Sequence, residues 1–256
     1  MSRPVGEIKV ASDLEELSQL AAEEFVRLAQ KAMGERGRFS VVLSGGKTPR
    51  TLYEILARAP LRDRVEWQCV DFFWGDERAV ASEDEESNFR MANETLITKV
   101  AVNPERVHRM PADEPDLDSA AKNYQNAIAR VFNVDPAGEP PSMDLVLLGL
   151  GPDGHTASLF PYTKAIDETE RWVVPNYVPR LRANRMTMTA RIINRAAEVM
   201  FLVAGEGKAV ALAQVLEGPY DPKRLPAQKI RPETGRLLWL IDRKAAGELK
   251  SRTQSS

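Results

Sequence analysis

The sequence predicts an α/β fold, with a mostly parallel sheet and helices on both of its faces. Short apolar runs rich in branched residues alternate along the chain with longer segments of helical periodicity, which is typical of such a sheet. A length of 256 residues, 43% of them hydrophobic, is enough to bury one large core. The proline-rich stretch 135–142 is followed by a strand that continues the alternation, so we interpret it as a surface loop. We therefore expect a single domain over residues 1–256, with its core at about residues 10–240.

A first helix is predicted from residue 12 onward. Ser12 and Glu15 form the pattern of a capping box, in which two side chains satisfy backbone N–H groups of the first turn. One helical face then carries the apolar residues Leu14, Leu17, Ala21, Phe25 and Leu28. Gly34 is expected to end this helix, whose role is structural.

Six apolar segments are predicted as strands, with helical segments between most of them. They are residues 39–43, 67–73, 143–148, 186–189, 199–204 and 237–241. In open α/β sheets, ligands bind beyond the carboxyl ends of the strands. The unusual segments at these strand ends are therefore the candidate functional sites.

The first such segment follows Leu43 and precedes a helical segment, and it reads Ser44-Gly45-Gly46-Lys47-Thr48-Pro49. Glycines let backbone N–H groups approach an anion, Thr48 can cap the helix, and proline favours the first helical turn. These features predict a phosphate-binding loop at a helix N-terminus, to which Lys47 would add a positive charge. A plain tight turn between strand and helix is the alternative.

A second segment, Gly75-Asp76-Glu77-Arg78, follows another predicted strand and precedes Ser87 and Asn88 at the start of a helix. The planar guanidinium of Arg78 suits a phosphate or a carboxylate. The alternative is that Arg78 forms only a surface ion pair with one of the two acidic residues before it.

The third segment, residues 149–161, begins with the G-x-G-x-x-G pattern of dinucleotide-binding proteins. We reject a dinucleotide site because the pattern requires a full helix after the last glycine, and Pro161 cuts such a helix short. The acidic residue required at the end of the next strand is also missing.

His155, one of only two histidines, lies in this loop with Asp153 two residues before it. A histidine at a strand end, with a carboxylate near enough to fix its tautomer, is what a general base requires near neutral pH. The alternative is a solvent-exposed or packing role, which we retain for the second histidine, His108.

Two further cations are candidate phosphate ligands. Lys208 ends the segment 205–208 after a predicted strand and would lie in the first turn of the helix 209–217, where the helix dipole disfavours a cation unless an anion is bound. Arg185, directly before the strand 186–189, is a weaker candidate for the same role.

Composition argues against several classes of function. The net charge is only −2, with both signs mixed along the chain, so we expect neither nucleic acid nor a membrane surface as a partner. Cys69 is the single cysteine, which excludes an internal disulfide and a thiolate zinc site, and we expect no metal and no cofactor. Residues 1–10 have no signal-like apolar region and no stretch is long enough to span a bilayer, so we expect a cytoplasmic protein. The oligomeric state stays open, with a monomer favoured.

Taken in order, these segments resemble the 6-phosphogluconolactonases, which belong to a larger group that also contains the glucosamine-6-phosphate deaminases. The resemblance spans about residues 10–240 and is strongest around His155. It implies a Rossmann-like fold, a phosphate site of the glycine loop and basic residues, and His155 as the base. The implied reaction is hydrolysis of 6-phospho-D-glucono-1,5-lactone to 6-phospho-D-gluconate in the oxidative pentose phosphate pathway. Lys47 departs from the family, which more often has serine or threonine there, and this leaves the contacts of that loop open.

Lactone hydrolysis needs an activated water, a stabilised oxyanion and a proton for the leaving ring oxygen. We assign the proton transfers to His155, oriented by Asp153, and expect Arg78 or backbone N–H groups of the glycine loop to face the oxyanion. The 6-phosphate would be held by residues 44–48, Lys208 and Arg185. Ser158 is a weak candidate nucleophile because it lacks the G-x-S-x-G elbow.

Two alternatives remain. The deaminases carry a glutamate a few residues beyond the histidine, in a stretch similar to F-N-E-P, whereas residues 157–161 read Ala-Ser-Leu-Phe-Pro and contain no acid. A sugar-phosphate sensor would normally carry a DNA-binding module, and the ten or so residues before the first helix are too few for one.

Overall fold

Residues 6–250, which the computed structural model describes, form two sheets; the first and last few residues of the predicted domain lie outside this range. The larger sheet is parallel throughout, in the order β1-β9-β8-β5-β2-β3, with the strands β1 (Glu7–Ala11), β2 (Phe39–Leu43), β3 (Val70–Trp74), β5 (Leu145–Leu148), β8 (Glu198–Val203) and β9 (Arg236–Asp242). The smaller sheet is antiparallel, in the order β4-β7-β6, with β4 (Asp76–Arg78), β6 (Val173–Val178) and β7 (Ala183–Met188).

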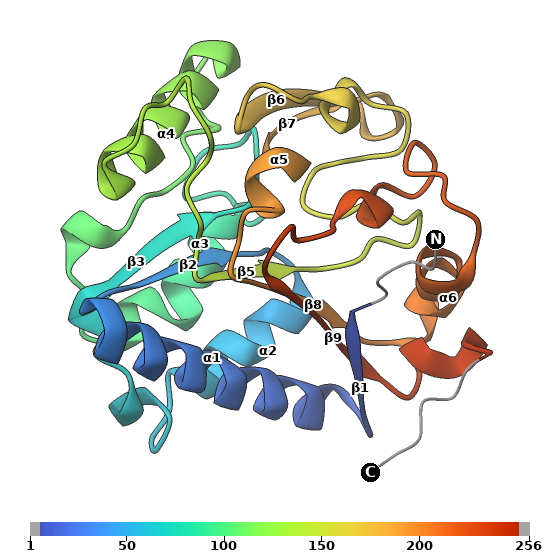
Figure 1. Ribbon diagram of the computed structural model, residues 1–256, viewed down its shortest axis with the longest axis horizontal. Coiled ribbons are helices and arrows are strands. Elements are labelled where there is room, and N and C mark those ends of the chain that lie inside the picture. Colours follow the sequence, from blue (N-terminus) through green and yellow to red (C-terminus); the bar gives the residue numbers. More distant parts are fainter. Residues whose placement is uncertain (1–5, 251–256) are drawn as a thin grey trace.

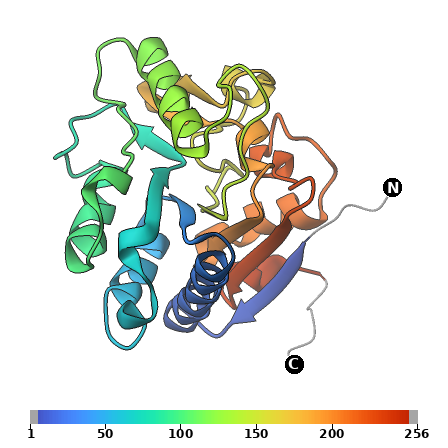
Figure 2. The ribbon, with the colours of Figure 1, turned by 60° about the vertical axis from the view of Figure 1, so that its left-hand side comes forward.

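Helices cover both faces of the larger sheet, which confirms the predicted α/β class. Figures 1 and 2 show α1 and α2 beneath this sheet, with α4, α5 and the smaller sheet above it. The α-helices in the described range are α1 (Leu14–Arg36), α2 (Lys47–Leu56), α3 (Asn88–Thr95), α4 (Leu117–Phe132), α5 (Ala190–Ile193) and α6 (Ala209–Glu217).

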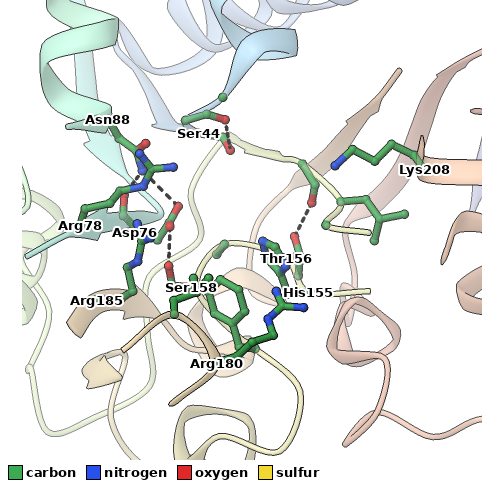
Figure 3. Close-up of a pocket in the computed structure, with 18 residues that line it drawn as sticks. Ser44, Asp76, Arg78, Asn88, His155, Thr156, Ser158, Arg180, Arg185 and Lys208 are labelled. Atoms are coloured by element: carbon green, nitrogen blue, oxygen red, sulfur yellow. Dashed lines mark hydrogen bonds between the residues drawn. The ribbon is translucent and has the colours of Figure 1, made fainter. Parts of the chain in front are cut away.

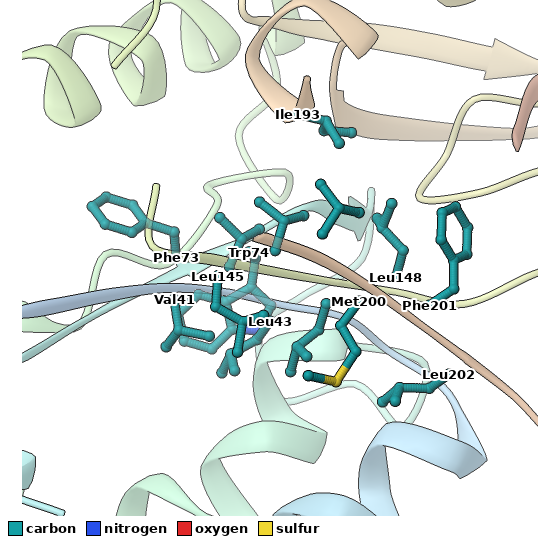
Figure 4. Close-up of a cluster of buried hydrophobic side chains, with 14 of the residues drawn as sticks. Val41, Leu43, Phe73, Trp74, Leu145, Leu148, Ile193, Met200, Phe201 and Leu202 are labelled. Atoms are coloured by element: carbon teal, nitrogen blue, oxygen red, sulfur yellow. The ribbon is translucent and has the colours of Figure 1, made fainter. Parts of the chain in front are cut away.

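The larger sheet is apolar because helices or the smaller sheet bury both of its faces. All residues of β2, β3, β5 and β8 are buried. Side chains such as Val41, Leu145 and Met200 extend from these strands into a single hydrophobic cluster (Figure 4). This core holds the strand ends, and the loops that follow them, in fixed relative positions.

The order of strands reverses between β2 and β5, which are neighbours in the sheet. From β2 the chain proceeds to β3 on one side, whereas from β5 it proceeds to β8 and β9 on the other. A crevice at the carboxyl ends of the strands forms at such a reversal because the following connections lead away in opposite directions. The loops after Leu43 and Leu148 therefore border the same crevice.

The first helix differs from its prediction at both ends. Its N-cap is Asp13 rather than Ser12: the Asp13 side chain accepts from the backbone N–H of Glu16, and the Glu16 carboxylate accepts from the N–H of Ser12. The helix also continues through Gly34 and ends at Gly37, which adopts the left-handed conformation with φ 67°.

The predicted strands differ from the observed ones mainly at their ends. Segment 39–43 matches β2, whereas residues 67–69 form a 3₁₀ turn before β3 and residues 143–144 precede β5. Residues 186–188 of the predicted segment 186–189 form the end of β7, and Thr189 lies beyond it. This strand pairs antiparallel in the smaller sheet and therefore does not continue the parallel alternation. Strands β1, β4 and β6 were not predicted.

Candidate active site

A pocket of about 390 Å³ opens beyond the carboxyl ends of β2 and β5. Figure 3 shows its side chains, which come from both sheets and from the loops between them. Its lining is formed by Ser44, Gly45, Gly46, Asp76, Arg78, Asn88, Gly149, Leu150, Gly151, His155, Thr156, Ala157, Ser158, Phe160, Arg180, Leu181, Arg185 and Lys208. The structure thus brings together all four strand-end segments.

His155 and Asp153 form a close pair in the loop after β5. The Nδ1 atom of His155 lies 2.5 Å from Oδ1 of Asp153, and the imidazole stacks on the ring of Phe160 with 4.0 Å between centroids. A carboxylate at Nδ1 fixes the tautomer in which Nδ1 carries the proton and Nε2 is free to accept one. Nε2 has no hydrogen-bond partner within residues 6–250, so this geometry would allow His155 to accept a proton from a bound molecule.

Two glycines of this loop are required by close packing. A Cβ atom at Gly151 would lie 2.0 Å from Nδ1 of His155 and 2.7 Å from Oδ1 of Asp153. Gly154 has a φ of 79°, and a Cβ atom there would lie 2.6 Å from Cδ2 of Leu225. These glycines serve the packing of the histidine and the turn, and no helix follows Gly154 in the way a dinucleotide site requires.

Contacts with His155 and Arg180 favour the ionised form of Asp153. Its Oδ2 lies 2.8 Å from a guanidinium nitrogen of Arg180. Burial, the largest contribution, favours the neutral acid, but the hydrogen bond and charge of His155, together with Arg180, outweigh it and lower the pKa of Asp153 to about 2. The carboxylate is therefore available to stabilise a protonated imidazole.

The loop after β2 contributes its first three residues to the pocket. Ser44 is buried, and its backbone N–H and C=O both bond to the hydroxyl of Tyr53 on α2. Helix α2 begins at Lys47 with Gly46 as its N-cap, so Thr48 does not cap it as predicted. Lys47 is exposed, and neither Lys47 nor Thr48 is part of the pocket lining.

Arg78 and Arg185 lie opposite each other on the antiparallel strands β4 and β7. Both line the pocket, and the side chain of Arg78 donates to the backbone carbonyl of Glu86 rather than to an acid. The predicted alternative for Arg78, an ion pair with Asp76 or Glu77, is therefore not observed.

Asp76 and Glu77 instead support the frame of the pocket. Both oxygens of the buried Glu77 carboxylate accept backbone N–H groups at the start of α3, from Asn88 and Phe89. Asp76 accepts a hydrogen bond of 2.6 Å from the hydroxyl of Ser158, which ties β4 to the loop that carries His155. The Ser158 hydroxyl is therefore bonded to Asp76 and not to His155.

Lys208 lies at the N-cap of α6, and its side chain points into the pocket from the side opposite Arg78 and Arg185 (Figure 3). Burial lowers the pKa of Lys208, while the charge of Asp153 acts in the opposite direction. Lys208 is half-buried at a helix N-terminus and forms no ion pair within the described residues, so its charge would be compensated by a bound anion.

The sequence model of the family described as glucosamine-6-phosphate isomerases/6-phosphogluconolactonase matches residues 12–239. The chain is 42% identical over 220 residues to a 6-phosphogluconolactonase of Synechocystis, covering 86% of this chain and 88% of that one. The chain belongs to this family. Among solved structures, the 6-phosphogluconolactonase of Trypanosoma cruzi superimposes with a TM-score of 0.84 at 28% identity, covering 96% of this chain and 97% of that one.

Both branches of the glucosamine-6-phosphate isomerase/6-phosphogluconolactonase family share this fold. A monomeric glucosamine-6-phosphate deaminase superimposes with a TM-score of 0.78 at 23% identity, covering 94% of this chain and 99% of that one. The fold therefore does not separate the two activities, and the side chains of the pocket must do so.

Within this family fold, His108 has the structural role that the sequence analysis retained for it. Its Nε2 lies 3.1 Å from Oδ1 of the buried Asp71, and its ring stacks on Phe73. It is not part of the pocket lining.

Sequence reasoning missed Arg180 and Phe160 as site residues. Arg180 lies in a short 3₁₀ turn after β6, far in sequence from Asp153, and no local pattern distinguishes it from other exposed arginines. Phe160 lies within segment 149–161, and its stacking on His155 depends on a loop conformation that the sequence does not reveal.

Residues 6–250 contain neither a membrane-spanning helix nor a cluster of metal ligands. No helix there is both long and apolar enough to cross a bilayer. No three His, Cys, Asp or Glu side chains of this part of the chain gather as metal ligands would.

Proposed function

We propose that this chain hydrolyses 6-phospho-D-glucono-1,5-lactone to 6-phospho-D-gluconate, the activity named for its relatives in the family. The observation that carries the proposal is the pair of His155 and Asp153, 2.5 Å apart, within a pocket that also presents cations to an anionic substrate. Hydrolysis of a lactone needs one group that can accept and return a proton, and the pair supplies it.

In the proposed mechanism, Nε2 of His155 accepts a proton from water while the water oxygen forms a bond to C1 of the lactone. The C1 carbonyl oxygen takes up the negative charge, and Asp153 stabilises the imidazolium through Nδ1. The intermediate then re-forms its carbonyl bond and breaks the bond from C1 to the ring oxygen. That oxygen receives the proton from His155, so the free enzyme is regenerated and the product is an acid.

The 6-phosphate is proposed to bind at the loop after β2 and at Lys208. Gly45 and Gly46 precede α2, where backbone N–H groups and the helix dipole favour an anion, and Lys208 supplies a half-buried positive charge. Binding energy from this remote group would position C1 at His155 without taking part in the bond changes.

The surroundings of His155 favour the lactonase over the deaminase. Phe160 packs on the imidazole in the segment where the deaminase pattern contains a glutamate. An aromatic ring there cannot transfer protons to an amino sugar, but it shields the pair of His155 and Asp153 from solvent.

The test follows acid release from freshly prepared 6-phosphogluconolactone, after subtraction of spontaneous hydrolysis. We expect rapid turnover, much slower turnover of unphosphorylated gluconolactone, and a loss of about 10²–10⁴-fold in kcat for His155→Ala with unchanged folding. Turnover by His155→Ala at the wild-type rate would remove this residue from the mechanism. Ammonia release from glucosamine 6-phosphate would instead support the deaminase.

A further inference from the structure

The pocket has two separate positively charged walls. In Figure 3, Lys208 lies on one side, Arg78 and Arg185 lie on the other, and His155 lies between them. Because His155 lies between the two sides, a phosphate bound at Lys208 leaves the two arginines available for a second anionic group. The role of Arg78 and Arg185 is therefore separate from that of Lys208.

The guanidinium groups of Arg78 and Arg185 are neighbours without an acidic partner. The two residues face each other in the register of β4 and β7, an arrangement that places like charges next to each other and is destabilising. Neither side chain forms an ion pair within residues 6–250. The Nε atoms of both are buried and have no hydrogen-bond partner in that range.

The nearest carboxylates are occupied by other contacts. Glu77 accepts from backbone N–H groups at the start of α3, and Asp76 accepts from Ser158. Burial is the main cause that lowers the pKa of Arg185, followed by the charge of Arg78, while acidic neighbours act in the opposite direction. Neither guanidinium forms an ion pair with these carboxylates or with Glu86, so a bound anion would supply the close partner that the two arginines lack within residues 6–250.

We infer that Arg78 and Arg185 form a second anion site, which binds the C1 carboxylate of the ring-opened product and the C1 oxyanion that precedes it. The inference rests on the proposed function. Paired guanidinium groups suit a planar carboxylate because each presents two parallel N–H donors. The preferred ligand class is then an aldonic acid phosphate, which carries one anion at each end of its chain and spans both walls.

In this arrangement Arg185 binds the C1 end of the substrate and not the phosphate. It also explains why the pocket retains an unfavourable pair of like charges, since the same pair stabilises negative charge that develops only during reaction.

The test compares two ligands that differ only at C1. 6-Phosphogluconate has a carboxylate there, and glucitol 6-phosphate has a neutral hydroxymethyl group on the same phosphorylated chain. Isothermal titration calorimetry gives Kd for both with the wild type, Arg185→Gln and Arg185→Lys. For Arg185→Gln we expect Kd of 6-phosphogluconate to rise by roughly tenfold or more, with little change for glucitol 6-phosphate. Arg185→Lys should recover part of the loss, because it keeps the charge but not the fork.

The matched control is Arg58→Gln, which removes one positive charge from an exposed position outside the pocket. It should change neither Kd. A purely structural role for Arg185 is tested by thermal unfolding without ligand, where Arg185→Gln should be at least as stable as the wild type because it relieves repulsion with Arg78.

Equal weakening of both ligands by Arg185→Gln would show that the pair binds the phosphate and would overturn the inference. Unchanged affinity for both ligands, or lack of 6-phosphogluconate binding by the wild type, would overturn it as well. Because the comparison needs no turnover, its result is separate from the lactonase assay, whose failure would overturn the proposed function instead.

Discussion

The imidazole of His155 packs directly against the Cα atom of Gly151. A Cβ atom at position 151 would lie 2.0 Å from Nδ1 and 2.1 Å from Cε1 of the imidazole. The hydrogen bond of 2.8 Å from the Gly151 N–H to the carbonyl of His155 holds the two residues in this position. The imidazole can occupy this position only because residue 151 has no side chain.

Gly151→Ala is therefore expected to displace the imidazole while leaving the fold intact. A displacement of this kind is expected to reduce kcat/KM for 6-phosphogluconolactone by about a hundredfold. The cost in stability should be about 1–3 kcal/mol, as for other overpacked sites. Steady-state kinetics and urea denaturation measure the two effects, and wild-type kinetics in this variant would contradict the packing argument.

Gly34→Ala provides the matched control and a prediction of its own. Gly34 is exposed within α1, and a Cβ atom there meets nothing within 4 Å. The variant should therefore be more stable by about 0.5–1 kcal/mol, because glycine inside a helix costs conformational entropy relative to alanine. Its kinetics should equal those of the wild type. A destabilised Gly34→Ala would mean that the helix ends at residue 34, as the sequence alone suggested.

The end of α1 shows why element boundaries are hard to predict. Gly34 and Gly37 are three residues apart, and either could adopt the left-handed conformation that terminates a helix. Only the packed structure selects Gly37, with its N–H bonded to the carbonyl of Met33. Strand β1 was missed for a related reason: it lies at the sheet edge and exposes most of its residues, so it lacks an apolar run.

Parts of the candidate site could be predicted where the relevant residues lie in one short segment of the sequence. The loops after β2 and β5 and the segment at Lys208 all follow strands, and the topology of a parallel sheet brings such ends together. Contacts between segments were not predictable. The neighbours Arg78 and Arg185 meet only because β4 and β7 pair in an antiparallel sheet that the sequence analysis did not foresee.

The pair of His155 and Asp153 predicts a specific dependence of stability on pH. The folded-state pKa of Asp153 is lowered from 3.8 to about 2, so its ionised form stabilises the fold above about pH 4, and this contribution is lost as the pH falls towards 2. Asp153→Asn should therefore reduce the free energy of unfolding more at about pH 5 than at about pH 3. Urea denaturation of both proteins at the two pH values measures the difference. An equal reduction at both would mean that the carboxylate gains nothing from His155 and Arg180.

The position of Lys208 leads to a prediction for ligand affinity at alkaline pH. Burial lowers the pKa of Lys208 below its ordinary value of 10.5, so the ammonium loses its proton, and with it its attraction for the phosphate, at lower pH than an ordinary lysine. Above about pH 8 the phosphate monoester is fully ionised, and the Kd of 6-phosphogluconate should rise with pH as Lys208 is neutralised. Lys208→Arg keeps its charge and should show no such rise. Lys208→Gln should bind roughly tenfold or more weakly than the wild type at pH 8, and its Kd should stay flat as the wild-type value rises towards it. If the wild type and Lys208→Arg showed the same alkaline dependence, another group would be titrating, and the phosphate would have to be placed away from the N-terminus of α6.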